Sequence, residues 1–113
     1  PRKSETAVRA DKWVSIIPGT DTALGLGMIR WIAANGKLDK PFLKQHTGAV
    51  YLVDKDGKLM REDAKDPNSY LVFDEKSQKL VRHDAKNIDP ALEVKAGSPY
   101  RTVLSMVLEQ AEP

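Results

Sequence analysis

The sequence predicts an α/β fold, in which a strand–turn–helix unit is followed by a β-hairpin excursion and a C-terminal helix. Residues 13–17 are mostly β-branched and aromatic, which is typical of a short buried strand. The Pro18-Gly19 pair after them favours a tight turn. Residues 20–34 then contain the longest apolar run of the chain, which indicates a helix covered on more than one side.

A short helix is expected before this unit. Ser4 is placed to cap its N-terminus, and Glu5 suits the positive end of the helix dipole in the first turn. The helix is expected to continue through about Arg9. It therefore precedes the strand by only a few residues.

The apolar helix contains two glycines, Gly25 and Gly27, and each lowers helix propensity by about 1 kcal/mol relative to alanine. Two interpretations remain open: the glycines allow close packing against a sheet or a cofactor, or the helix is simply weakened. Asn35-Gly36 predicts the helix end, because glycine readily adopts the left-handed conformation. The expected buried face consists of Ala23, Leu26, Ile29 and Ile32, widened by Leu24, Met28 and Trp31.

Residues 39–46 predict a further short helix. Asp39 is its expected cap, Pro41 lies in its first turn, and Phe42 and Leu43 are its expected buried residues. His46, at the helix end, is interpreted as a surface residue because no partner for acid–base chemistry is evident.

The middle of the chain predicts two hairpins. Residues 51–60 turn at Asp56-Gly57, a strong two-residue hairpin signal, and residues 70–83 form a second hairpin with a longer loop. Residues 84–98 are expected to be irregular. A last helix is predicted to start at Ser98 and Pro99, with an apolar face made of Val103, Leu104, Val107, Leu108 and Ala111.

Composition excludes several classes of function. The 113 residues carry a net charge of +2 with the two signs interspersed, which argues against a nucleic-acid surface. No apolar run approaches the roughly 18 residues that a membrane-spanning helix needs, and the N-terminal residues do not resemble a signal peptide. The absence of cysteine excludes disulfides, thiolate zinc sites and an iron–sulfur cluster held by this chain.

The turn at Gly19, Thr20 and Asp21 is the main candidate for chemistry. Unpaired N–H groups and the helix dipole favour an anion or polar ligand at a helix N-terminus, but the Asp21 carboxylate should repel a phosphate placed on it. A carboxylate instead suits guanine, whose ring N–H and exocyclic amine can both donate to it. The alternative is that Thr20 or Asp21 merely caps the helix, a contribution of about 1 kcal/mol.

Residues 1–47 carry a series of short motifs in a characteristic order. These are Pro1-Arg2 and Ser4-Glu-Thr-Ala7, then Ala10-Asp11, the strand, Pro18-Gly-Thr-Asp21, the helix, and Asp39 with Phe42 and Thr47 behind it. In this order and spacing, the segment closely resembles the molybdopterin oxidoreductases of the dimethyl sulfoxide reductase family. The resemblance is weaker over residues 48–113, and the acidic residue expected before Pro1 is absent.

The resemblance implies a cofactor and its contacts. Members of the family bind molybdenum or tungsten through two molybdopterin guanine dinucleotides, and the Pro-Gly-Thr-Asp turn lies against one guanosine. Gly19, Thr20 and Asp21 are thus implied as cofactor-binding residues, with Asp21 on the guanine edge, and Arg2 and Ser4 lie near the same nucleotide. No catalytic residue or metal ligand is expected in this chain, because the metal's protein ligand generally lies upstream, and any iron–sulfur cluster lies elsewhere.

The fold class and partners follow from these expectations. Residues 1–47 are predicted to be part of a Rossmann-like, pterin guanine dinucleotide-binding domain, 48–97 a hairpin-rich insert, and 98–113 the C-terminal helix of the same domain. The partners that the family implies are electron-transfer subunits and the remainder of a catalytic subunit, in a bacterial or archaeal cytoplasm or periplasm. An alternative is a stand-alone, non-catalytic module that binds a guanine nucleotide or a protein. An unpaired strand at 13–17 would promote self-association of the isolated segment.

Overall fold

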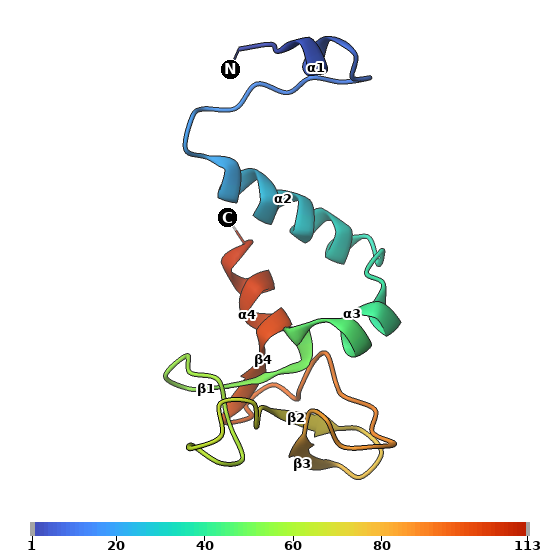
Figure 1. Cartoon of the computed structure of the whole chain (residues 1–113), viewed down its shortest axis with the longest axis vertical. Helices are drawn as coiled ribbons and strands as arrows, with labels where there is room; N and C mark the ends of the chain where they lie inside the picture. The colour runs from blue at the N-terminus through green and yellow to red at the C-terminus, as the bar shows by residue number, and fades with distance from the viewer. Residues whose placement is uncertain (1, 113) are drawn as a thin grey trace.

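The secondary structure divides the chain into a helical N-terminal part and a mixed part that contains all the strands (Figure 1). The structure is a computed structural model that describes residues 2–112, so Pro1 of the Pro-Arg motif and Pro113 lie outside the described residues. The helices are α1 (Glu5–Val8), α2 (Asp21–Ala34), α3 (Lys40–His46), the 3₁₀ turn η1 (Gly48–Val50) and α4 (Val103–Gln110). The strands are β1 (Leu52–Asp54), β2 (Leu71–Asp74), β3 (Lys79–Arg82) and β4 (Tyr100–Thr102).

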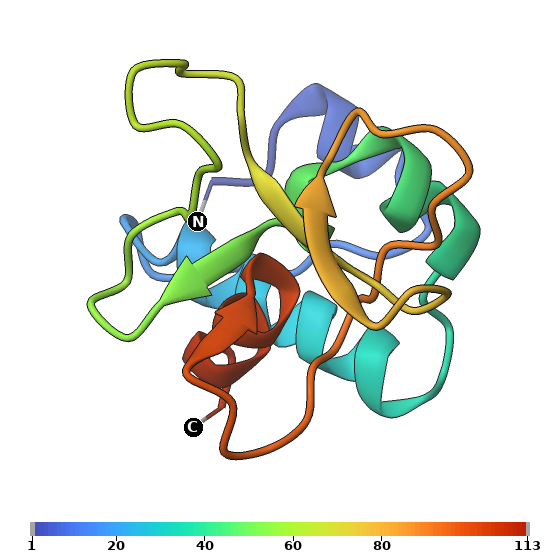
Figure 2. The ribbon, with the colours of Figure 1, turned by 90° about the horizontal axis from the view of Figure 1, so that it is seen from below.

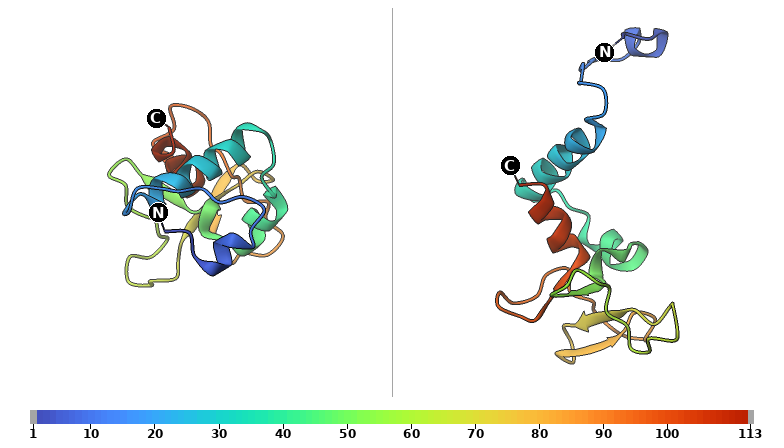
Figure 3. Two further views of the ribbon diagram at one scale, coloured as in Figure 1. Left: turned by 90° about the horizontal axis from the view of Figure 1, so that it is seen from above. Right: turned by 90° about the vertical axis from the view of Figure 1, so that its left-hand side faces the viewer.

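The strands form two small antiparallel sheets. β2 pairs with β3 as a hairpin, with Leu71 opposite Arg82. β1 pairs with β4, which lies almost fifty residues further along the chain, with Leu52 opposite Thr102. Figure 2 shows both sheets at one end of the molecule, close to α4. The described chain is elongated, with extents of 51 × 28 × 28 Å, and α1 lies at the end away from the sheets (Figure 3).

The hydrophobic core lies in the second half of the chain. Its buried cluster consists of Val50, Val72, Leu92 and Leu104, so it joins the 3₁₀ turn, the β2–β3 hairpin, the irregular segment and α4. No residue between 2 and 47 is buried. Leu38 and Leu43 pack against the edge of the core and attach α3 to it. The segment with the strongest motifs is therefore the less well packed part of the chain.

Helix ends follow the sequence closely. Ser4 Oγ accepts a hydrogen bond from the Ala7 N–H at 3.2 Å, which confirms it as the cap of α1. α2 ends as predicted, because Gly36 has a φ of +64° and the Lys37 N–H donates to the Ile32 carbonyl at 2.9 Å. Asp39 caps α3 through a 3.0 Å bond from the Phe42 N–H.

The predicted strand over residues 13–17 does not form in the described chain. These residues are extended, but no strand lies beside them, so their backbone groups have no ladder to join. Val14 and Ile17 expose 68% and 75% of their surface, so the prediction that this segment is buried is also wrong for the chain alone. Wider Rossmann-like architecture and the three-part domain division stay predictions.

α2 is present but its apolar face is largely uncovered. Met28 and Trp31 expose 55% and 57% of their surface, and no residue of the helix is buried. Only its contact with α4, visible in Figure 1, shields part of one side. The expectation that the helix is covered on more than one side is therefore wrong within the described chain. Phe42, expected to be buried, is 53% exposed, whereas Leu43 does pack against the core.

Both predicted hairpins are confirmed, but the last helix starts later than expected. The first hairpin turns at Gly57, with a φ of +80°, and its return arm bridges Val53 through Leu59. Residues 100–102 form β4 instead of the first turn of the last helix, because they pair with β1. Thr102, not Ser98, then caps α4 by accepting a 3.1 Å bond from the Ser105 N–H. Among residues 2–112, no helix combines the length and apolar character needed to span a membrane.

Candidate functional site

The turn before α2 has the geometry that its sequence predicts. The Thr20 N–H donates to the Ile17 carbonyl at 3.1 Å, and Gly19 has a φ of +86°. Proline followed by a residue with positive φ is the signature of a type II turn. A Cβ added at Gly19 would meet no atom within 4 Å, so the outer face of the turn is open.

The side chains of Thr20 and Asp21 do not cap the helix. Thr20 Oγ1 donates to the Ile17 carbonyl at 2.6 Å and makes no capping bond to α2. Asp21 is the first helical residue and is exposed, and its carboxylate takes part in no hydrogen bond or ion pair among residues 2–112. The helix-capping alternative therefore finds no support in the side-chain contacts of the described chain.

Arg2 and Ser4 lie apart from this turn. Both are exposed residues before α1, and Ser4 Oγ is already engaged as the α1 cap. The exposed segment between α1 and α2 separates them from residues 19–21 (Figure 1), and no hydrogen bond or ion pair joins the two groups in the described chain. The structure thus brings Gly19, Thr20 and Asp21 together but does not add Arg2 and Ser4 to them.

The surroundings of the turn are apolar and exposed. Ile17 precedes the turn, Leu24 follows it in the first turns of α2, and both are largely uncovered. Gly25 and Gly27 face open space, since a Cβ at either would have no neighbour within 4 Å. Neither glycine is therefore explained by close packing inside the described chain.

The titratable group with the clearest environment lies far from this turn. Asp74 is buried at the end of β2, and the Asp89 N–H, the Ser77 hydroxyl and two turn N–H groups donate to its carboxylate. These bonds lower the pKa of Asp74 from 3.8 to about 2. Sequence reasoning missed this residue, although an Asp at a strand end with Ser three residues later favours such a turn. Its role is structural, because it joins the β2–β3 hairpin to the irregular segment.

No metal centre is formed by the residues that the structure describes: they contain no group of three potential metal ligands. His46 packs its ring against Phe42, with a centroid distance of 5.2 Å, and does not approach the turn. The described residues thus offer one site of recognised sequence character, the turn at residues 19–21.

Comparison with known proteins supplies the wider context. No family model matches the chain. It is 51% identical over 47 residues to the large chain of a selenate reductase from Mesobacillus selenatarsenatis, a match that covers 42% of this chain and 4% of that protein. It is 46% identical over 53 residues to the alpha subunit of respiratory nitrate reductase from Haloferax mediterranei, covering 47% and 5% of the two chains.

A third relative extends the range of reductases. The chain is 41% identical over 56 residues to a putative dimethyl sulfoxide reductase catalytic subunit of Halobacterium salinarum, covering 50% of this chain and 7% of that protein. The chain therefore spans only a small fraction of the length of the curated relatives it matches. Its relatives define it as a segment of an oxidoreductase catalytic subunit. The chain belongs to the dimethyl sulfoxide reductase family of molybdopterin oxidoreductases, and this family implies a molybdenum cofactor.

Proposed function

We propose that this chain is the part of a molybdopterin-dependent catalytic subunit that holds the guanosine end of a molybdopterin guanine dinucleotide at Gly19, Thr20 and Asp21. One observation carries the proposal: the Asp21 carboxylate is exposed at the first turn of α2 and has no hydrogen-bond partner among residues 2–112. It is therefore free to accept from a ligand.

The donor set of guanine fits this carboxylate. Guanine presents a ring N–H beside an exocyclic amine, so one carboxylate can accept two parallel hydrogen bonds, whereas adenine lacks the ring N–H. The open face of Gly19 leaves room for a base or ribose to approach the backbone. Thr20 Oγ1 retains lone pairs for a ligand while its proton is donated to Ile17.

A Rossmann-like domain would also account for the exposed apolar surface. In the intact subunit, residues 13–17 would join a parallel sheet as a strand, and the apolar face of α2 would cover that sheet. Gly25 and Gly27 would then permit close approach of helix and sheet, or of helix and cofactor. Arg2 and Ser4 would complete the nucleotide site once the segment before α2 is held by neighbouring strands.

The intact subunit would carry out chemistry that this segment does not encode. Bound molybdopterin would supply the metal for transfer of an oxygen atom or an electron pair with a small inorganic or organic substrate. The metal's protein ligand, the catalytic residues and any iron–sulfur cluster would come from the remainder of the subunit. Electron-transfer subunits are its proposed partners.

A nucleotide titration tests the guanosine site. The ¹⁵N-labelled chain would be titrated with GDP and, as the matched control ligand, ADP. We expect amide shifts centred on residues 19–24 with GDP, and a preference over ADP that Asp21→Asn reduces about tenfold, because the amide presents its own N–H₂ to a donor.

The control variant is Asp11→Asn, which removes an exposed carboxylate of the same N-terminal part. It should leave the GDP preference unchanged. Equal responses to GDP and ADP, or a GDP preference that survives Asp21→Asn, would refute the assignment of Asp21 to the guanine edge.

A further inference from the structure

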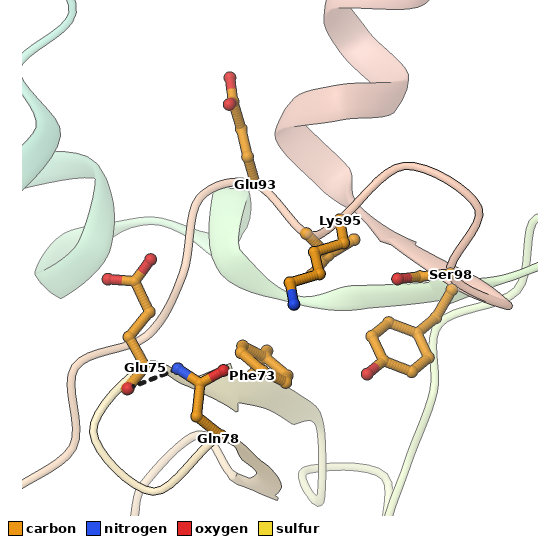
Figure 4. A pocket seen from close by; sticks show the side chains of 8 residues that line it. Phe73, Glu75, Gln78, Glu93, Lys95 and Ser98 are labelled. Atoms are coloured by element: carbon orange, nitrogen blue, oxygen red, sulfur yellow. Dashed lines mark hydrogen bonds between the residues drawn. The ribbon is translucent and has the colours of Figure 1, made fainter.

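A second hollow lies at the sheet end of the molecule, where the β2–β3 hairpin, the irregular segment and β4 meet (Figure 4). Its volume is about 350 Å³, within the range of pockets that bind small molecules. It shares no residue with the turn at residues 19–21. The side chains that matter for recognition are Phe73, Gln78, Val94, Lys95, Ser98 and Tyr100.

Several polar groups in this hollow lack partners within the chain. The Lys95 ammonium and the hydroxyls of Ser98 and Tyr100 take part in no hydrogen bond or ion pair among residues 2–112. In Figure 4 the Lys95 amino group extends toward the space above Phe73, and the Ser98 hydroxyl points toward Lys95. Gln78 donates through Nε2 to the Glu75 carbonyl at 2.7 Å, which fixes its amide at the edge of the hollow.

Two carboxylates border the hollow without neutralising Lys95. Glu75 lies 3.8 Å from Lys44, on the side of α3. Glu93 points away from Lys95 in Figure 4. Both glutamates also line the neighbouring hollow, which contains Lys40 and Lys44. Lys95 is therefore the one cationic residue among the described residues that line the first hollow.

The combination of these groups selects a ligand class. Ammonium and hydroxyl groups donate hydrogen bonds that a carboxylate accepts, and charge-assisted bonds of this kind are the stronger ones. Phe73, Val94 and Tyr100 provide an apolar and aromatic wall against which a flat ring can pack. We propose that this hollow binds a small aromatic carboxylate, with its carboxylate toward Lys95 and Ser98 and its ring against Phe73.

The test uses the ¹⁵N-labelled 113-residue chain and three ligands of one size: benzoate, neutral benzamide and cationic benzylamine. We expect saturable shifts with benzoate, confined to residues 73–78 and 93–100. Benzoate should bind about fivefold more tightly than benzamide, the factor expected for one charge-assisted hydrogen bond at a half-open site.

Two variants assign the contacts. Lys95→Gln should abolish the preference for benzoate over benzamide, whereas Lys86→Gln, which changes an exposed lysine of the same irregular segment outside the hollow, should preserve it. Phe73→Leu retains an apolar side chain and should weaken both ligands equally. The spectrum of each variant without ligand checks that the fold is retained.

Three results would overturn the proposal. These are tighter binding of benzylamine than of benzoate, benzoate shifts scattered over lysines throughout the chain, and a benzoate preference unaffected by Lys95→Gln. Each concerns the sheet end only, so the outcome is independent of the guanosine proposal for residues 19–21.

Discussion

Replacing Thr102 by valine should destabilise the chain more than its small change in shape suggests. Thr102 is fully buried between β4 and α4. Its Oγ1 donates to the Leu92 carbonyl at 2.6 Å and accepts from the Ser105 N–H at 3.1 Å. Thr102→Val keeps the volume but removes both bonds.

The magnitude follows from the two losses. Removing a helix cap costs about 1 kcal/mol. Leaving the Leu92 carbonyl without its donor costs about 1–3 kcal/mol, because a buried acceptor loses its compensation for desolvation. The added methyl group returns about 0.8 kcal/mol of hydrophobic transfer free energy. The free energy of unfolding should therefore fall by about 2 kcal/mol.

Urea denaturation followed by circular dichroism at 222 nm measures this change. Tryptophan fluorescence is a poor probe, because Trp13 and Trp31 are both exposed and lie outside the core. The matched control is Thr102→Ser, which keeps the hydroxyl and loses one methyl group, at a cost of about 1 kcal/mol. If the valine variant were as stable as the serine variant, the hydroxyl would not contribute as described.

Two further predictions concern the division of stability and its pH dependence. Hydrogen exchange should be at least about tenfold slower for amides of β1, β2 and α4 than for those of α2, because only the former adjoin the buried core; equal protection would contradict this. The pKa of Asp74 is lowered in the folded state, so its ionised form stabilises the fold above pH 3.8, and this contribution is lost as the pH falls toward about 2. Asp74→Asn should flatten the stability–pH curve in that window, and an unchanged slope would argue against it.

Local chemistry was predictable because it depends on residues close in sequence. The Ser4 and Asp39 caps, the glycine stop of α2 and the Gly57 hairpin each involve partners within five residues. The elements that differed depend on distant partners. β4 forms because β1 is available to residues 100–102, and residues 13–17 lack a neighbouring strand in the described chain. Neither fact is encoded near the segment that it affects.

The same distinction applies to the two candidate sites. Gly19, Thr20 and Asp21 are consecutive, so a motif could indicate them together. The second hollow draws Phe73, Lys95 and Tyr100 from separate segments, and no spacing rule connects them. Sequence reasoning therefore found the contiguous site and missed the one that only tertiary contacts assemble.

The distribution of burial sets how the guanosine site should behave in isolation. Asp21 is held by a helix that has no buried residue and that contacts α4 along one side only. If α2 is docked for only a fraction of the time, the apparent affinity for GDP falls by that fraction. The same fraction multiplies the affinity for ADP, so it cancels from the ratio of the two. The GDP preference, and its loss in Asp21→Asn, thus reports on the carboxylate itself even where α2 is incompletely held.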